Sequence, residues 1–211
     1  MLFRTSPEKF WNLIASRYAA SPISDSSAYA TKIEKIKSYL SSKDVVLDIG
    51  CGTGTQCGDL AGDVRQVTGI DISGKLLAIA AQRTDERKLA NVSFIQTSLF
   101  DERFQPESFD VVMAFFVLHF FDDLDAVLKR VHELLKPGGL FISETVCLGE
   151  KSKMGGMLLR LAGHLGFLPK MNLLTTDMIT NALEQTGLLV VDKVIFSQRD
   201  DAEYTLFARK S

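Results

Sequence analysis

The sequence predicts a doubly wound α/β domain, with a seven-stranded, mostly parallel sheet that ends in an antiparallel hairpin. Three observations predict it. Short apolar runs alternate with amphipathic helical segments, a glycine-rich turn follows the first run, and a short polar loop separates the last two runs. Strand–helix alternation favours parallel strands joined by right-handed crossovers. With 211 residues, 46% of them hydrophobic, the chain suits one such domain.

Two helices are expected before the first strand. A serine, a proline and an acidic residue at 6–8 predict a helix start. Ser21-Pro22 ends this helix, whose inward face comprises Phe10, Trp11, Ile14 and Tyr18. A second helix is expected over 27–40, with Ile33, Ile36 and Leu40 facing inward. Residues 1–40 are therefore expected to form an N-terminal helical cap on a single domain of residues 1–211.

Five apolar runs predict the parallel strands, at 44–49, 66–71, 92–96, 110–115 and 140–144. The fourth run is almost wholly apolar, as expected of a strand that is buried on both faces. A helix is expected from Ser73 onward. Before the fifth run, Pro137-Gly138-Gly139 ends the clearest helical stripe, which comprises Leu124, Val127, Leu128, Val131, Leu134 and Leu135.

The C-terminal part changes character. Thr175 or Thr176 is expected to cap a helix that runs through Thr186 and ends at Gly187. Two further apolar runs, 189–196 and 204–209, flank a polar loop of only a few residues. A parallel crossover needs about a dozen residues, so these two runs predict an antiparallel hairpin.

Composition and charge argue against several functions. A formal net charge of -2 is not typical of a nucleic-acid-binding protein. The three cysteines, Cys51, Cys57 and Cys147, have no spacing typical of a disulfide framework or a zinc site, and they fit a reducing compartment. No signal peptide is evident, and no window has the roughly 18 apolar residues of a membrane span. We therefore expect a cytoplasmic protein without a metal site.

The strongest functional signal is a glycine loop after the first predicted strand. Gly50, Gly52 and Gly54 stand at alternate positions, where glycine lets the backbone turn sharply and approach a ligand. Ligands of open α/β sheets bind beyond the carboxyl ends of the strands. Asp71 ends the second predicted strand, where a carboxylate can accept hydrogen bonds from both hydroxyls of a ribose. Ile72 beside it can lie against an adenine ring.

Two alternatives stay open for this loop. The dinucleotide-binding pattern G-x-G-x-x-G would need a glycine at position 55, and Thr55 stands there. An NAD-type oxidoreductase is therefore the less favoured nucleotide-binding enzyme. A tight strand–helix turn with a capping aspartate would explain the same residues without any ligand.

The segment Asp-Ile-Gly-Cys-Gly-Thr-Gly at 48–54 resembles the S-adenosylmethionine (SAM) motif of class I methyltransferases, which have a Rossmann-like fold. Three further stretches match in the same order: 69–73 resembles the ribose-binding acidic loop, 109–119 the fourth-strand motif, and 134–140 the turn into the fifth strand. The chain is similar to the bacterial small-molecule methyltransferases that include the quinone-biosynthesis C-methyltransferases. Residues 10–23 and 145–150 resemble one branch of that group.

The resemblance implies SAM as cofactor and S-adenosylhomocysteine as its product. Asp48, Gly50 and Gly52 would contact the methionine part, and Asp71 would hold the ribose. Cys51 lies between the two glycines, so we place it in the cofactor site without a catalytic role.

The remaining cofactor contacts follow from the same resemblance. Ile72 would contact the adenine, and Ser98 and Leu99 would lie at its edge. Many relatives have an aspartate where Ser98 stands, and a serine can accept the same hydrogen bond without a charge. Ala114 and Phe115 would line the methionine end.

A general base is optional in this chemistry. Methyl transfer from a sulfonium is an in-line displacement that depends chiefly on alignment and exclusion of water. His119 is the candidate base because imidazole titrates near neutral pH, and a structural histidine is the alternative. Tyr18 would close over the cofactor from the first helix, or else serve as a core aromatic residue.

Residues 149–174 interrupt the strand–helix alternation where the family often inserts a substrate lid, and they are rich in Met, Leu and Gly. A lid of this composition implies a small lipophilic or aromatic acceptor. Core packing and a homodimer interface are the alternatives. A SAM-binding protein without catalytic activity is the remaining alternative for the whole chain, and the acceptor atom stays open.

Overall fold

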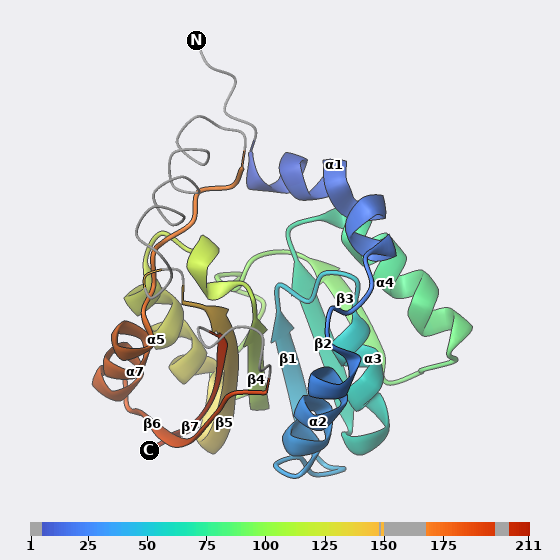
Figure 1. The fold of residues 1–211 in the computed structure, drawn as a ribbon. Helices are drawn as coiled ribbons and strands as arrows, with labels where there is room; N and C mark the ends of the chain where they lie inside the picture. The colour runs from blue at the N-terminus through green and yellow to red at the C-terminus, as the bar shows by residue number, and fades with distance from the viewer. Residues whose placement is uncertain (1–5, 148, 150–167, 197–202) are drawn as a thin grey trace.

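The computed structural model describes residues 6–147, 149, 168–196 and 203–211. A seven-stranded sheet forms its centre, in the order β3-β2-β1-β4-β5-β7-β6 (Figure 1). The strands β1 to β5 pair in parallel, and β7 runs antiparallel between β5 and β6. The predicted fold class is confirmed, including the C-terminal hairpin.

The bounds of the elements follow the predicted runs closely. The strands are β1 (Val45–Ile49), β2 (Gln66–Asp71), β3 (Val92–Gln96), β4 (Phe109–Phe115), β5 (Leu135–Val146), β6 (Leu188–Val194) and β7 (Glu203–Lys210). The helices are α1 (Pro7–Ala20), α2 (Ser26–Lys37), α3 (Thr55–Leu60), α4 (Gly74–Glu86), α5 (Leu124–Leu134) and α7 (Thr176–Gln185). Two short 3-10 turns are η1 (Ala61–Asp63) and η2 (Leu118–Phe120).

Side-chain caps fix the helix starts that the sequence predicts. Ser6, Ser73 and Thr175 each accept a hydrogen bond from the backbone N–H three residues further on, which satisfies an otherwise unpaired donor of the first turn. Of the two threonines that the sequence left open, Thr175 is the cap. The start of α4 at Ser73 matters for function because it follows directly on Asp71 and Ile72.

Several predicted boundaries are wrong. The fifth strand, expected over 140–144, spans Leu135–Val146, and the strand expected over 189–196 spans Leu188–Val194. The helix expected over 27–40 ends at Lys37, because the N–H groups of Tyr39 and Leu40 turn back to carbonyls three residues earlier and tighten the last turn. The helix expected through Leu135 ends at Leu134, because Leu135 pairs with Phe109 as the first residue of β5. The register shifts between Phe109 and Val111, so that the proline and glycines after Leu135 form a bulge in β5.

Two apolar clusters pack the faces of the sheet. Neighbouring residues of β1 alternate, so that Leu47 joins the cluster beneath α5 and α7, and Val46 joins the one beneath α2 and α3. Figure 1 shows these helix pairs on either side of the sheet. Because helices cover both faces, a ligand can reach the sheet only at the ends of its strands. In open α/β sheets ligands bind at the carboxyl ends.

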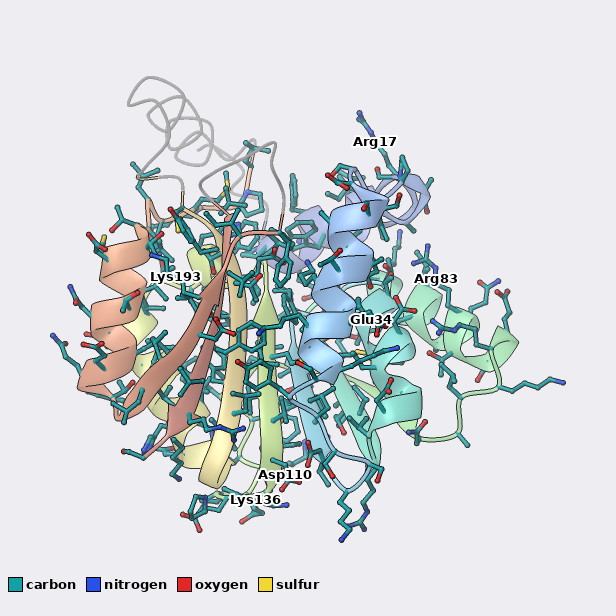
Figure 2. All side chains as sticks on the ribbon, turned by 60° about the horizontal axis from the view of Figure 1, so that its bottom comes forward. Arg17, Glu34, Arg83, Asp110, Lys136 and Lys193 are labelled. Atoms are coloured by element: carbon teal, nitrogen blue, oxygen red, sulfur yellow. The ribbon has the colours of Figure 1, made fainter. Side chains whose placement is uncertain are left out.

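The two ends of the sheet differ. At the end where β4 begins, Asp110 accepts a hydrogen bond from the N–H of Val45 and pairs with Lys136 at 2.7 Å. Figure 2 shows Asp110 and Lys136 side by side, at the opposite end of the sheet from Arg17 of α1. In Figure 1, α1 lies across the carboxyl ends of the strands. Within the described residues, no helix combines the length and apolar character that crossing a membrane requires.

Candidate functional site

A cavity of about 470 Å³ lies at the carboxyl ends of the strands. Its walls come from α1, the glycine loop, the ends of β2 to β4, η2 and residues 168–170. Eight residues that the sequence assigns to the site line it: Tyr18, Gly50, Gly52, Asp71, Ile72, Ser98, Leu99 and Phe115. Four assigned residues do not: Asp48, Cys51, Ala114 and His119.

The glycine loop turns through three left-handed residues. The φ angles of Gly50, Gly52 and Gly54 are 67°, 55° and 68°, a region that disfavours residues with a Cβ. A Cβ on Gly50 would lie 2.6 Å from Cγ2 of Val117, whereas a Cβ on Gly52 would meet only the Tyr18 ring, at 3.7 Å. Gly50 therefore allows close packing against Val117, and Gly52 leaves its backbone open to the cavity.

Asp71 joins the glycine loop to the start of α4. Its Oδ2 accepts a hydrogen bond from the N–H of Gly52 at 3.0 Å, and its Oδ1 accepts one from the N–H of Ser73 at 2.8 Å. Burial raises the pKa of Asp71, and these N–H donors oppose the rise. Each oxygen can accept a further hydrogen bond, and Asp71 lines the cavity, so the carboxylate fits a pair of ligand hydroxyls.

Asp48 lies behind the glycine loop and away from the cavity. It is 1% exposed, and its Oδ2 accepts a hydrogen bond from the thiol of Cys57 at 3.1 Å. Burial raises the pKa of Asp48 to about 7. Cys51 is also buried. The neighbouring thiol of Cys57 lowers the pKa of the Cys51 thiol, but burial and the nearby carboxylates outweigh it and raise this pKa. This arrangement supports the glycine loop from behind, and neither residue lines the cavity.

The wall beside Asp71 suits a flat apolar group. Ile72 is 37% exposed, and Ser98 and Leu99 continue the same wall of the cavity. The N–H of Thr97 bonds to the carbonyl of Asp71 at 3.1 Å, which fixes this loop to the end of β2. Ala114 is fully buried within β4, and its neighbour Phe115 is the residue that reaches the cavity.

Helix α1 is fastened beside the site by a residue that the sequence did not single out. Oδ1 of Asn12 accepts hydrogen bonds from Oγ of Ser73 and the N–H of Lys75, at 2.8 and 3.0 Å. These bonds hold α1 to the N-terminus of α4. Tyr18 lies over Gly52, and partial burial and the charge of Asp71 raise its pKa.

Much of the remaining lining of the cavity is aromatic. It is lined by Trp11, Phe115, Phe116, Phe120 and Phe121, with Val117, Leu168 and Pro169 among them. Trp11 and Phe120 meet edge to face, with ring centroids 5.5 Å apart. The sequence signal that was available is the density of aromatic residues at 115–121. We placed Trp11 on the inward face of the first helix, but neither it nor Phe116, Phe120 and Phe121 was assigned to the site.

Charged side chains lie beside the aromatic lining. Lys170 pairs with Asp122, and both line the cavity. The N–H of Asn172 bonds to the carbonyl of His119 at 2.8 Å, so the segment after residue 168 is tied to η2. Residues 150–167, the main part of the expected lid, lie outside the described residues.

His119 is buried rather than directed at the cavity. It is 6% exposed, its ring packs on Phe120, and burial lowers its pKa to about 4. Among the described residues its Nδ1 has no hydrogen-bond partner. A neutral imidazole in this position does not reach the cavity that the other site residues share, so the role of general base has no support from the structure.

The described part of the chain gathers no set of three or more histidine, cysteine or acidic side chains that could hold a metal ion. The charged residues that line the cavity are Asp71, Asp122 and Lys170. The arrangement as a whole therefore offers one carboxylate for ligand hydroxyls, a bare backbone loop and an aromatic chamber.

A methyltransferase domain family matches residues 40–187 of the chain. The match spans both the glycine loop and Asp71, and the chain belongs to this family. Among the relatives, the ubiquinone biosynthesis O-methyltransferase of Bradyrhizobium diazoefficiens is 32% identical over 169 residues, which are 78% of this chain and 64% of that protein. The demethylmenaquinone methyltransferase of Lactococcus lactis is 37% identical over 97 residues, 44% of this chain and 38% of that protein. The chain thus spans less than two thirds of the length of either relative.

The fold is shared with solved structures of low sequence identity. The [4+2]-cyclase SpnF superposes with a TM-score of 0.78 at 18% identity, over 98% of this chain and 96% of that one. Because that protein is described as a cyclase, the fold by itself does not define the reaction. The reaction must be argued from the residues of the site.

Proposed function

We propose that this chain transfers a methyl group from SAM to a small aromatic or lipophilic acceptor. The observation that carries the proposal is a single cavity in which the glycine loop and Asp71 face an aromatic chamber. One part offers the Asp71 carboxylate, which can accept hydrogen bonds from ligand hydroxyls, and an open backbone loop. A nucleoside with an amino-acid tail requires both. The other part offers flat apolar walls, which favour a planar acceptor.

The residues present fit the cofactor. The missing Cβ of Gly52 leaves room beside the loop, and both Asp71 oxygens are held by backbone N–H groups in a fixed orientation. Asp71 would hold the ribose hydroxyls, Ile72 and Leu99 would contact the adenine, and Ser98 would lie at its edge. When bound, SAM supplies an electrophilic methyl group on a sulfonium. Asp48 and Cys51 would act by supporting the loop from behind.

The task of the chain is then to bind, orient and exclude water. Trp11, Phe116 and Phe120 would hold the acceptor ring. The hydrogen bond between Asn12 and Ser73 would keep α1, and with it Trp11, in place beside the cavity. Near-attack alignment of this kind supplies most of what an in-line displacement needs. Since burial keeps His119 neutral and out of the cavity, we propose that a phenol or quinol acceptor reacts as the anion that it forms in solution, so that its proton is lost to water before binding and not to His119.

Names of the relatives support an aromatic acceptor. The matching proteins are described as methyltransferases of ubiquinone biosynthesis and of demethylmenaquinone, and quinones and their reduced forms are planar and apolar. We propose that an alkyl-substituted phenol or quinol is the acceptor class. The cap role of residues 1–40, the lid role of residues 149–174, a homodimer and a cytoplasmic location remain proposals beside it.

The experiment has a binding arm and a transfer arm. Trp11 is the one tryptophan of the chain and lines the cavity, so its fluorescence reports ligands there. We expect SAM and S-adenosylhomocysteine to change it and to give heat in calorimetry, and NADH to do neither. In the transfer arm, isotopically labelled SAM is incubated with a panel of alkyl phenols, catechols and reduced demethylmenaquinone, and labelled products are identified by mass spectrometry.

The outcomes separate the alternatives. Binding of NADH without SAM would support an oxidoreductase and overturn the proposal. Binding of SAM with no methylated product across the panel would support a SAM-binding protein without transferase activity, or one with another activity. Methylation of a phenol or quinol ring or hydroxyl supports the proposal and identifies the acceptor atom.

A further inference from the structure

Phe116 has a backbone conformation that is unusual for its residue type. Its φ angle is 54°, in the left-handed region, directly after β4 ends at Phe115. Bulky residues rarely adopt this conformation, and where they do the surrounding structure must hold them there. The Phe116 side chain is 38% exposed and lines the cavity. A strained residue at the wall of a ligand cavity is a candidate for a specific role.

Two contacts hold Phe116 in place. Its N–H donates a hydrogen bond of 2.7 Å to the backbone carbonyl of Glu144. Nζ of Lys32 lies 5.3 Å from the centroid of its ring, within the range of a cation–π interaction. The same ammonium lies 5.4 Å from the ring of Phe115 and 5.5 Å from that of Tyr29.

The ammonium is itself fixed by a buried ion pair. Nζ of Lys32, from α2, contacts Oε2 of Glu144, at the end of β5, at 2.5 Å. Both residues are nearly inaccessible, with 6% and 5% of their surface exposed. The pair thus joins α2 to β5 beside the backbone contact between Glu144 and Phe116.

Stability alone gives a weak reason for such a pair. Taking two charges out of water is costly, and replacement of a buried pair by neutral residues is often harmless or stabilising. A fixed charge does, however, impose one arrangement on the rings around it. Here the rings around the charge are those of Tyr29, Phe115 and Phe116, which we call the aromatic corner.

We propose that the Lys32–Glu144 pair is a positioning device and that Phe116, which it holds, determines which acceptors fit the cavity. The proposal rests on the proposed function, because it assigns Phe116 to the acceptor end of the same cavity. Lys32 and Glu144 do not line the cavity and act through the Phe116 ring. The acceptor class that this corner recognises is a planar aromatic ring.

The test compares three variants. In the first, Lys32→Met and Glu144→Gln together remove the buried charges without leaving either one unpaired. In the second, Phe116→Leu keeps an apolar side chain and removes the ring. The third combines all three substitutions. The matched control is Lys35→Met with Asp192→Asn. It neutralises an ion pair between the same helix, α2, and β6, and this pair is partly exposed and does not line the cavity.

The readouts separate positioning from a general structural role. Affinity for S-adenosylhomocysteine and the melting temperature are measured for every variant, and 1-naphthol serves as an aromatic probe in calorimetry. With an acceptor from the phenol and quinol panel, KM and kcat are measured separately. We expect the neutralised pair to weaken 1-naphthol binding and raise acceptor KM about 2- to 30-fold, the range that cation–π energies allow. Affinity for S-adenosylhomocysteine should stay within about twofold, and the control should match the wild type.

The Phe116→Leu background decides the mechanism. If Lys32 acts through the ring, neutralising the pair in that background should have no further effect, which is the non-additivity of coupled residues. Additive effects, or an equal loss of S-adenosylhomocysteine and 1-naphthol affinity, would overturn the positioning role. Should the double substitution fail to fold, a Phe116→Leu variant with unchanged 1-naphthol affinity and acceptor KM also overturns it. Failure of the proposed function is distinct, because the wild type itself would then show no SAM binding or no methyl transfer.

Discussion

The Gly50→Ala substitution should destabilise the protein by two additive physical effects that the structure separates. Gly50 has a φ angle of 67°, and a residue with a Cβ in the left-handed region costs roughly 1–2 kcal/mol. The new Cβ would also lie 2.6 Å from Cγ2 and 2.9 Å from Cβ of Val117, and overpacking of this kind costs typically about 1–3 kcal/mol. Alanine lowers the entropy of the unfolded chain, which returns about 0.4–1 kcal/mol. The net loss should be about 1–4.5 kcal/mol.

Two other glycines serve as matched controls. Gly138 has a φ angle of 72°, and no heavy atom lies within 4 Å of the position that a Cβ would occupy, so Gly138→Ala should show the backbone cost alone, about 0–1.5 kcal/mol. Gly62 has neither a positive φ nor a neighbour within 4 Å, so Gly62→Ala should be neutral or stabilising by up to about 1 kcal/mol.

The assay is equilibrium urea unfolding of the three variants, with Val117→Ala and the double variant Gly50→Ala with Val117→Ala added. Truncating Val117 removes the clashing methyl groups, so the double variant should be less destabilised than the sum of the single variants. Strict additivity of Gly50→Ala and Val117→Ala, or equal losses for Gly50→Ala and Gly138→Ala, would refute the packing argument.

Three further predictions concern charge. Asp71→Asn should weaken S-adenosylhomocysteine binding about 10- to 150-fold in calorimetry, because it removes a charged acceptor worth about 1.5–3 kcal/mol, while Asp63→Asn, outside the cavity, should change nothing. Since burial raises the pKa of Asp48 from 3.8 to about 7, this group stabilises the fold below pH 4 and loses that contribution as pH rises to 7. Asp48→Asn should therefore reduce the fall of melting temperature over that window. The pH dependence of the His119 contribution has the opposite sign. Burial lowers the pKa of His119 from 6.5 to about 4, so its contribution to stability is present above pH 6.5 and is lost toward pH 4. His119→Asn should therefore reduce the fall of melting temperature in acid.

Each of these predictions has a clear contrary result. Equal affinities of Asp71→Asn and Asp63→Asn would remove the ribose role of the carboxylate. Because the Asp48 and His119 effects oppose one another between pH 4 and pH 6.5, the wild type alone cannot resolve them. Melting curves of both variants with the slope of the wild type across pH 4–7 would show that neither group titrates as the buried positions require.

The fold could be predicted from the sequence because local patterns specify most of its elements. The apolar runs at 66–71 and 92–96 became β2 and β3 with the predicted bounds, since runs of buried residues between turns indicate strands directly. The boundaries that failed depend on contacts beyond the local pattern. Leu135 continues the apolar stripe of α5, and only its pairing with Phe109 across the sheet shows that it belongs to β5.

The cofactor end of the site was predictable for the same reason. The roles expected of Gly50, Gly52 and Asp71 depend on backbone shape and one carboxylate, and all three residues line the cavity. Asp48 shows the limit of the motif. The family resemblance implied a ligand contact for Asp48, but its side chain accepts a hydrogen bond from Cys57 and does not line the cavity.

The aromatic lining to which we assign the acceptor could not be predicted, because no single stretch of sequence contains it. Trp11 comes from α1, Phe116 and Phe120 follow β4, and Pro169 comes from a segment near α7. Each residue taken alone is typical of ordinary core. Only the tertiary structure brings these residues together around one cavity. The left-handed φ angle of Phe116 cannot be recognised from composition or periodicity. Under the proposed function, acceptor specificity is therefore set by the packing of α1 and α2 beside the end of β4, where Trp11 and Phe116 line the cavity and Nζ of Lys32 lies 5.3 Å from the centroid of the Phe116 ring.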